Sequence, residues 1–301
     1  MKRFVAKIIL LFAIILICDR VFGFCMENVV NSIDIGGQGR DNYICNTAKE
    51  DILIFGSSRA VHHYNPLILE DSLDMSCYNC GDDGNGIILS YGRLVMAKPR
   101  HMPKVIIHDV SPEFDLFAND NHKYLGWLKN RYDRKGIKEI FDVIDKTERY
   151  KMYSQMYRYN SKFLLNLFVY LTKTATDTGV NGFRPLHSDM DTMKISKKND
   201  ESKQYDFDPV KLRFINNFIE QSKGAKLIFV VSPMWYGMDT NKTSPLQDIC
   251  HDQEIAFIDF SNNQKYVHNN LYFTDGTHLN ATGADEFTKD LIKELRVRGI
   301  P

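Results

Sequence analysis

Short apolar runs alternate with amphipathic stretches along most of the chain. Five runs have the length of buried strands and are bounded by glycine, proline or polar residues. They are Ile52–Phe55, Asp74–Tyr78, Lys104–Asp109, Leu227–Val231 and Ile255–Asp259. Because helical patterns separate these runs, we expect a five-stranded parallel sheet covered on both faces. The predicted fold class is α/β, a flavodoxin-like three-layer α/β/α sandwich.

Helix signals lie between the predicted strands. Apolar residues spaced for one buried face predict a helix over Ile87–Met96. Asp208 and Pro209 suit the N-cap and first position of a second helix, which Gly224 closes. Asn280 is the expected cap of a final helix over residues 281–295, and a short helix is expected around residues 245–251.

The middle of the chain, residues 112–204, follows a different pattern. Helical periodicity dominates it, as in Ile137–Ile144 and Phe163–Leu171, and residues 177–202 read as a polar loop. We interpret this region as a helical insertion on the loop side of the sheet, where insertions often shape access to a site. The alternative is a set of helices that only cover the core. An aromatic stripe, either a sugar platform or a packing surface, consists of Tyr150, Tyr153, Tyr157 and Tyr159.

The N-terminus has the pattern of an export signal. Three basic residues precede an apolar run that starts at Ile8, and the whole segment Phe4–Phe24 is long enough to span a bilayer. We therefore predict a signal anchor over residues 1–24, with a cleaved signal peptide as the alternative. A stalk over residues 25–50 and the α/β domain over residues 51–301 follow on the periplasmic or extracellular side.

Length and charge narrow the function classes. At 301 residues the chain can bury one large core. Lys+Arg and Asp+Glu are both 38, so the formal net charge is zero. Nucleic acid is not an expected partner, because binding a polyanion usually needs a basic surplus. No His/Cys cluster in the sequence has zinc spacing, and we expect neither a metal nor another cofactor.

Two short motifs carry the side chains of a hydrolytic triad. The first predicted strand ends in Gly56-Ser57-Ser58-Arg59, and a late loop reads Asp275-Gly-Thr-His278. A serine hydroxyl becomes an effective nucleophile when an imidazole takes its proton, and a carboxylate fixes the imidazole tautomer. Ligands of parallel sheets bind beyond the carboxyl ends of the strands. We expect Ser58, His278 and Asp275 to meet there as nucleophile, base and orienting acid.

The order of these motifs resembles the SGNH (GDSL-like) hydrolase superfamily, over roughly residues 50–110 and 225–297. That family has its serine after the first strand and an Asp-x-x-His block near the end. Its second block supplies a glycine N–H that holds the oxyanion. Within Asn79-Cys-Gly81-Asp-Asp-Gly84 the better match is Gly84, with Gly81 in reserve. The resemblance implies oxyanion donors at the N–H groups of Ser58 and Gly84.

One block departs from the family pattern. The third block usually reads Gly-x-Asn-Asp, and its asparagine donates to the oxyanion, whereas this chain has His108-Asp-Val-Ser-Pro112-Glu. The oxyanion hole then depends on backbone donors, or on a donor from the insertion. Loss of one such donor costs about 10²–10³ in rate.

This departure, the Ser-Ser pair, the anchor and Ser232-Pro-Met-Trp235 resemble a membrane-anchored branch of the superfamily. The branch includes the D-alanine-transfer protein of teichoic acid modification and O-acetyltransferase-like proteins of exopolysaccharide assembly. The likeness implies a serine-dependent esterase or O-acyltransferase acting on acyl esters of a cell-envelope polysaccharide. A different interpretation is a structural anchor whose helical insertion docks a partner, a membrane acyl-donor protein. The alternative is a catalytically silent glycan- or partner-binding protein of envelope polymer assembly.

Further residues have a functional and a structural interpretation. Substrate-binding candidates are Arg59, Asn79, Asp109 and Trp235. Arg59 would bind an anionic group or form a salt bridge, and Trp235 would line a sugar pocket or pack. For the triad, the alternatives are Ser57 as nucleophile, Ser58 as a helix cap and Asp275 as a turn residue.

Overall fold

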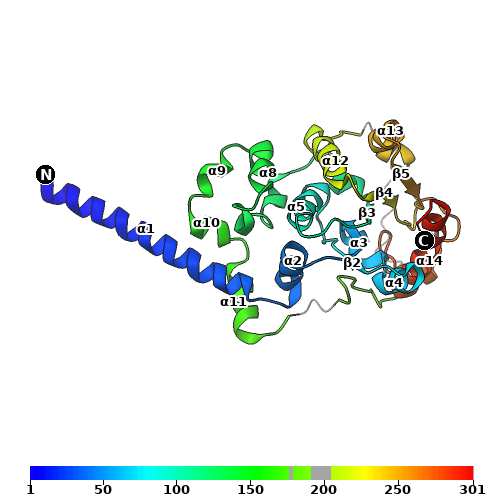
Figure 1. Ribbon diagram of the computed structural model, residues 1–301, viewed down its shortest axis with the longest axis horizontal. Coiled ribbons are helices and arrows are strands. Elements are labelled where there is room, and N and C mark those ends of the chain that lie inside the picture. The colour runs from blue at the N-terminus through cyan, green and yellow to red at the C-terminus, as the bar shows by residue number, and fades with distance from the viewer. Residues whose placement is uncertain (176–178, 191–204, 301) are drawn as a thin grey trace. The chain divides into compact units, whose positions relative to one another are not determined.

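Five parallel strands form one sheet in the order β2-β1-β3-β4-β5 (Figure 1). This is the flavodoxin-like order, so the predicted fold class is confirmed. The strands are β1 (Ile52–Gly56), β2 (Cys77–Asn79), β3 (Val105–Asp109), β4 (Lys226–Val231) and β5 (Ala256–Asp259). In register, Gly56 of β1 lies opposite Asp109 of β3, and Asp109 lies opposite Val230 of β4. The carboxyl ends of the three central strands therefore meet at one edge.

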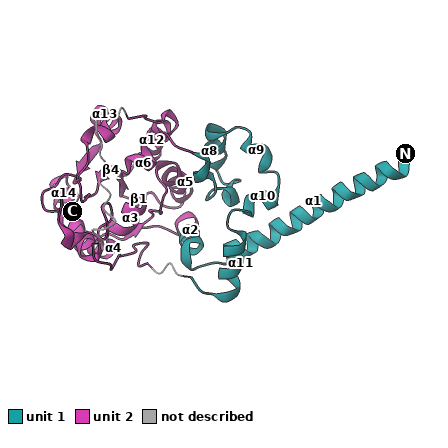
Figure 2. Cartoon of the chain, turned by 180° about the vertical axis from the view of Figure 1, so that it is seen from behind, with its two compact units in different colours: residues 1–43, 121–178 teal, residues 44–120, 179–301 magenta. Residues whose placement is uncertain are grey.

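The structure is a computed structural model that describes residues 1–175, 179–190 and 205–300. The chain divides into two compact units (Figure 2). The sheet unit comprises residues 44–120 and 179–301, and the helical unit comprises residues 1–43 and 121–178. Of the polar loop predicted over residues 177–202, residues 177–178 and 191–202 lie outside the described residues.

Alternate residues of each strand face opposite helical layers of the sheet unit. Ile54, Ile107 and Val230 belong to a core that includes residues of α3 (Ser58–His63), α4 (Pro66–Leu73) and α14 (Ala281–Val297). On the other face, Phe55 and Phe229 contact Phe218 of α12 (Pro209–Ser222), which lies beside α5 (Ile87–Ala97). Burying one such side chain stabilises the fold by about 1.5–3 kcal/mol. The remaining elements of this unit are α6 (Pro112–Asp115), η3 (Thr240–Thr243), α13 (Ser244–Asp252) and η4 (Asn270–Tyr272).

Helix caps follow the sequence signals, whereas one strand starts later than expected. The side chain of Asp208 accepts from the Val210 N–H, and that of Asn280 accepts from the Gly283 N–H. The second strand begins at Cys77 and not at Asp74, because Asp74 ends α4 in the left-handed conformation with φ 50°. A residue in that conformation cannot continue into a sheet.

The helical unit contains every helix of the predicted insertion that follows residue 120. These are α7 (His122–Leu125), η1 (Lys129–Arg131), α8 (Ile137–Ile144), α9 (Glu148–Lys151), α10 (Gln155–Tyr159) and α11 (Phe163–Thr172). The unit also contains α1 (Lys2–Asn31), and its boundary with the sheet unit falls within α2 (Gly36–Asn46). The insertion as a separate unit is therefore shorter than residues 112–204.

Within the described residues, α1 is the one helix long and apolar enough to cross a membrane, which is compatible with an anchor or a signal sequence. It continues past residue 24 to Asn31, and its Met26 and Val30 are buried against Tyr159 of α10. Residues 25–50, expected as a polar stalk, are thus mostly helical. The assignment of anchor, stalk and catalytic domain stays a prediction.

The last helix offers a pH-dependent test of the fold. The Asp290 carboxylate accepts from Lys265 Nζ, Tyr266 Oη and Lys293 Nζ, each at 2.7 Å. Burial raises the pKa of Asp290, but these hydrogen bonds outweigh it and lower the pKa to about 2. Because the folded pKa is depressed, the stabilisation exists above about pH 4 and disappears as the pH falls to about 2. We expect Asp290→Asn to lower the free energy of unfolding at pH 7 by about 1 kcal/mol, because solvent screens these ion pairs, and to weaken the loss of stability in acid. Thermal unfolding of the wild type and of Asp290→Asn between pH 7 and pH 2 measures this difference. Melting temperatures that fall equally in both proteins would contradict the prediction.

Candidate active site

The turn after β1 sets the position of the candidate nucleophile. Gly56 has φ 139°, and an added Cβ would lie 2.7 Å from the Asp109 carbonyl oxygen, so this position requires glycine. The chain then enters α3, with Ser57 at the N-cap and Ser58 as its first residue. Ser57 is fully buried, whereas Ser58 is partly exposed. This strand–turn–helix geometry presents the Ser58 hydroxyl at the carboxyl edge of the sheet.

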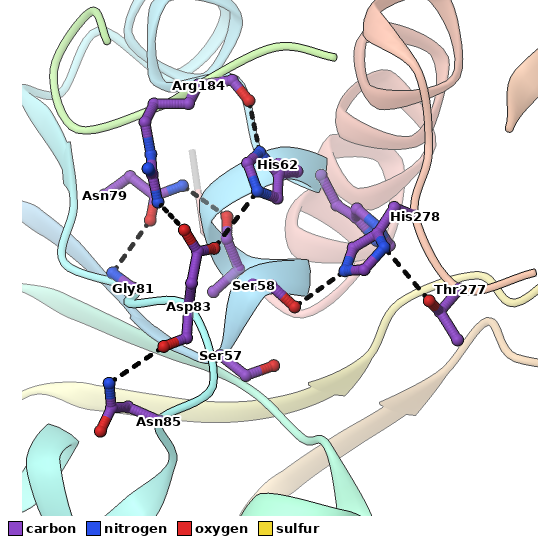
Figure 3. A network of polar contacts seen from close by, with 12 residues as sticks. Ser57, Ser58, His62, Asn79, Gly81, Asp83, Asn85, Arg184, Thr277 and His278 are labelled. Carbon is purple, nitrogen blue, oxygen red and sulfur yellow. Dashed lines mark hydrogen bonds and ion pairs between the residues drawn. The ribbon is translucent and has the colours of Figure 1, made fainter. Parts of the chain in front are cut away.

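The structure brings Ser58, His278 and Asp275 together. Ser58 Oγ lies 2.8 Å from His278 Nε2 (Figure 3), and His278 Nδ1 lies 2.9 Å from Asp275 Oδ2. A carboxylate only accepts hydrogen bonds, so Nδ1 carries the proton and donates it to Asp275. Nε2 is then an acceptor, and the Ser58 hydroxyl donates to it. The chain of hydrogen bonds is the one that a serine nucleophile needs for its activation.

Asp275 also builds the turn on which His278 stands. Its Oδ1 accepts from the backbone N–H groups of Thr277, at 2.8 Å, and His278, at 2.9 Å. Burial raises the pKa of Asp275, but the hydrogen bond and charge of His278 outweigh it, so the pKa lies well below the usual value. The carboxylate is therefore ionised at neutral pH. The turn role and the orienting role, predicted as alternatives, coexist in one residue.

A second histidine, buried in the core, holds the loop that carries Asp275 and His278. His63 is fully buried, its Nε2 accepts from the Leu279 N–H at 3.0 Å, and its Nδ1 donates to Ser232 Oγ at 2.9 Å. Burial, together with the charge of Arg59, holds the pKa of His63 well below its usual value, so the ring is neutral. His63 is a core histidine, and its contact to Leu279 positions His278. The sequence held no signal for this contact, because its partners lie 169 and 216 residues away.

A second acid–histidine pair, also missed by sequence reasoning, lies beside the first. His62 and His278 meet edge to face with ring centroids 5.8 Å apart. His62 Nε2 lies 3.3 Å from Asp83 Oδ1, and its Nδ1 donates to the Arg184 carbonyl oxygen at 2.6 Å (Figure 3). Burial raises the pKa of Asp83, but His62 and Arg184 reverse this and hold it well below the usual range. The charged side chains of Asp83 and Arg184 therefore flank His62, which contacts the ring of His278.

The candidate oxyanion donors are arranged as free N–H groups. Among the described residues, no hydrogen bond of the protein uses the backbone N–H of Ser58 or Gly84. Ser58 occupies the first position of a helix, where an N–H has no partner within the helix. Gly84 has φ 69°, and a Cβ added to it would meet nothing within 4 Å, so one side of this residue faces open space. Both groups remain predicted donors.

The block that departs from the family pattern, residues 108–113, places a buried serine beside Ser57. Ser111 is buried, and its Oγ lies 2.6 Å from Ser57 Oγ. The Ser111 N–H donates to Asp115 Oδ2 at 2.6 Å. Ser57 is thus paired with a hydroxyl and not with an imidazole, and this geometry favours Ser58 over Ser57 as the nucleophile.

Three of the four substrate-binding candidates lie inside the protein, where their side chains are buried and already hydrogen-bonded. Asn79 Nδ2 donates to the Ala60 and Tyr64 carbonyl oxygens, and its Oδ1 accepts from the Gly81 N–H. Asp109 is 0% exposed and binds Arg59 Nε, Tyr64 Oη and the Ser232 N–H. Arg59 is 5% exposed, and it donates to Asp109 and to the Val110 carbonyl oxygen. These residues support the loops of the site from inside.

Trp235 is the remaining candidate. It is half-buried, and its Nε1–H donates to Asn270 Oδ1 at 2.8 Å. Its backbone N–H donates to the Gly276 carbonyl oxygen at 3.3 Å, so it contacts the loop that carries Asp275 and His278. A role in lining a sugar pocket stays a prediction.

A group of side chains that could hold a metal ion occurs in the helical unit, within the part of the chain that is described. It consists of His122, Asp145 and Glu148. Glu148 already accepts from Lys151 Nζ and Tyr157 Oη. The group contains none of the residues that surround Ser58, and the expectation that the site uses no metal is not tested.

Comparisons with known proteins leave the family open. No protein-family model matches the chain, and no curated protein matches it. A solved Bacteroides fragilis structure, provisionally described as an acylhydrolase, is 11% identical with a TM-score of 0.45, covering 88% of this chain and 98% of the other. A Streptococcus pneumoniae structure, provisionally described as a platelet-activating factor, is 12% identical with a TM-score of 0.40, covering 96% and 99%. Neither likeness is strong enough to carry an assignment, so the resemblance to the SGNH superfamily and to its membrane-anchored branch stays a prediction.

Proposed function

We propose that the protein is a serine-dependent esterase or O-acyltransferase that acts on acyl esters of a cell-envelope polysaccharide. One observation carries this proposal: the hydrogen-bonded chain from Ser58 Oγ through His278 to the Asp275 carboxylate. The partly exposed Ser58 at the carboxyl edge of the sheet supports it, because ligands of such sheets bind there.

In the first half of the reaction, Ser58 Oγ attacks the acyl carbonyl carbon while His278 Nε2 takes the hydroxyl proton. Asp275 stabilises the imidazolium that forms. The carbonyl oxygen becomes an oxyanion, to which the N–H groups of Ser58 and Gly84 donate. The ester bond then breaks, His278 returns the proton to the leaving sugar oxygen, and the acyl group remains on Ser58.

In the second half, His278 takes a proton from the acceptor, and the acceptor oxygen attacks the acyl-enzyme. Water as acceptor gives hydrolysis, and a sugar hydroxyl gives transfer. The exclusion of water from the site would favour transfer. His278 finally returns its proton to Ser58, so the enzyme is regenerated without a cofactor.

The choice of an envelope substrate depends on α1. A chain held by this helix with its sheet unit outside the cytoplasm meets glycans of the cell envelope and not cytoplasmic esters. The membrane-anchored proteins that the sequence resembles support the same substrate class. A membrane acyl donor is the partner expected for transfer.

The test uses the full chain purified in detergent, with Ser58→Ala as the matched control. Each protein receives p-nitrophenyl acetate, alone and with a de-O-acetylated envelope polysaccharide. We expect the wild type to release p-nitrophenolate, and to place acetyl groups on the polysaccharide if it is a transferase. Mass spectrometry of the glycan and the absorbance of the phenolate measure the two products.

If the wild type forms neither free acetate nor acetylated glycan above the Ser58→Ala level, the proposal fails. Binding of the same polysaccharide without turnover would then assign the catalytically silent alternative. Turnover that is equal in both proteins would place the reaction elsewhere in the molecule.

A further inference from the structure

The apolar surface of α1 continues to the part of the helix that packs against α10. Side chains from Phe4 to Ile17 are exposed along the helix, as expected for contact with lipid. Past Asp19, Val21 is still 57% exposed and Phe24 70% exposed, while Asp19 and Gly23 are buried. One face of the helix at residues 19–24 therefore keeps the character of a lipid-facing surface, while the opposite face packs against protein.

At residues 19–24, α1 packs against the start of α10, and hydrogen bonds join the two helices. The Asp19 carboxylate accepts from Ser154 Oγ at 2.9 Å and from the N–H groups of Gln155 and Met156, both at 3.0 Å. Arg20 donates to the Tyr153 carbonyl oxygen at 2.7 Å. A buried carboxylate is costly to leave without hydrogen bonds, so these three bonds favour the packing of this segment on α1. Residues 153–156 are thus held at the height of Asp19 on α1.

Close packing adds to these bonds. A Cβ placed on Gly23 would lie 2.5 Å from Gln155 Cγ, so glycine allows α10 to approach α1 at this position. In Figure 1, α9 and α10 lie on the side of the helical unit from which the exposed part of α1 projects. The α9–α10 segment is therefore the part of this unit nearest to the predicted span.

Three large side chains of this segment are more than half exposed. Tyr153 is 71% exposed, Tyr150 61% and Met156 57%. Tyrosine has an apolar ring and a polar tip, and it is enriched where hydrocarbon meets the lipid headgroups. The neighbouring Arg149 and Lys151 are also exposed, and such cations favour anionic headgroups.

We propose that Tyr150, Tyr153 and Met156, here called the membrane foot, insert into the headgroup layer of the bilayer that α1 crosses. The bonds to Asp19 hold the foot at this depth, and α1 is retained as part of the fold and not removed as a signal peptide. This gives the exposed aromatic residues a lipid role in place of the sugar platform considered from the sequence. The proposal depends on α1 as an anchor and is independent of the proposed chemistry.

A depth measurement on the full chain in vesicles of phosphatidylcholine and phosphatidylglycerol tests the foot. The background carries Cys18→Ser and Cys25→Ser, which remove the two exposed thiols. The other four thiols are buried, and burial raises the pKa of Cys250 to about 12, so they stay unlabelled. Tyr153→Cys receives an environment-sensitive fluorophore. Glu139→Cys, an exposed position on α8 of the same unit, is the matched control.

We expect lipids with a nitroxide at the headgroup to quench the label at position 153 several-fold more than the label at position 139. Adding Asp19→Ala to the Tyr153→Cys protein releases the foot and should lower this quenching, although the protein stays in the vesicle fraction. Equal quenching at positions 153 and 139 overturns the proposal. A mature protein that lacks residues 1–24 overturns it as well, and intact mass measurement detects that outcome.

Discussion

Replacement of Ser58 by alanine is expected to lower the ester hydrolysis rate about 10⁴-fold or more, because serine hydrolases lose this much when the nucleophile is removed. The variant has no hydroxyl 2.8 Å from His278 Nε2, so no acyl-enzyme forms. The side chain is small and partly exposed, so the fold is expected to persist. Initial rates with p-nitrophenyl acetate, and thermal unfolding of the same samples, measure both effects.

The neighbouring serine supplies the matched control. Ser57→Ala removes a buried hydroxyl whose partner is Ser111 Oγ and not an imidazole. We expect a small loss of stability, about 1 kcal/mol, and activity far above that of Ser58→Ala. If Ser57→Ala abolished hydrolysis and Ser58→Ala did not, Ser57 would be the nucleophile, and the geometry described for Ser58 would have no role in the reaction.

Asp275→Asn is expected to lower kcat about 10⁴-fold with a much smaller change in KM. The amide NH₂ can donate to His278 Nδ1, which stabilises the tautomer that has its proton on Nε2. That tautomer cannot accept the Ser58 proton, whereas in the native site Nδ1 donates to Asp275 Oδ2 at 2.9 Å. Steady-state kinetics at pH 7 measure the split between kcat and KM. A loss of less than about tenfold would contradict the orienting role.

The pH dependence of Asp275 separates this effect from a loss of folding. Burial opposes ionisation, but His278 lowers the pKa of Asp275 below its usual value of about 3.8. Its stabilising contribution is therefore complete above about pH 4 and decreases only as the pH falls through the lower folded value. Near neutral pH the Asp275 carboxylate is therefore ionised, so a loss of activity measured there does not arise from its protonation.

Thr277→Val keeps the Asp275 carboxylate and removes one hydroxyl donor to Asp275 Oδ1 at 2.9 Å. We expect the activity of this variant to fall only slightly.

The sheet and the triad could be predicted because their signals are local. Apolar runs bounded by glycine or proline, such as the run that ends at Gly56, mark buried strands with little ambiguity. The spacing of Asp275 and His278 fits one turn, in which a single carboxylate accepts from N–H groups two and three residues later. The parallel sheet then brings Ser58 to the same edge as this loop, 220 residues away.

The scaffold around the triad could not be predicted because its contacts are distant in sequence. Arg59 lies next to the nucleophile in sequence, yet its guanidinium points inward to Asp109, 50 residues away. Asn79 matches a family block, but it holds the turn at Gly81 and the end of α3. The role of His63 depends on Ser232 and Leu279. Residue type and position in a motif do not show burial, and burial decides between binding a substrate and supporting a loop.

In the helical unit, too, local elements could be predicted from the sequence, whereas distant contacts could not. Helical periodicity predicts α8 with the bounds Ile137–Ile144 that the structure has. It does not predict that α1 continues to Asn31, or that Asp19 holds α10, because a polar residue after an apolar run reads as the end of a span. The partner of Asp19 lies 135 to 137 residues later, beyond any local pattern.

The most direct test of the central claim is to locate the covalent adduct that a fluorophosphonate forms on the full-length native protein. The reagent reacts with a serine whose hydroxyl is activated by an imidazole, so it reports the Ser58–His278 contact in solution. Peptide mass spectrometry after proteolysis gives the modified residue. We expect one adduct, on Ser58, and none in the His278→Ala variant. An adduct on another residue, or ester hydrolysis that persists with Ser58 unmodified, would contradict the account.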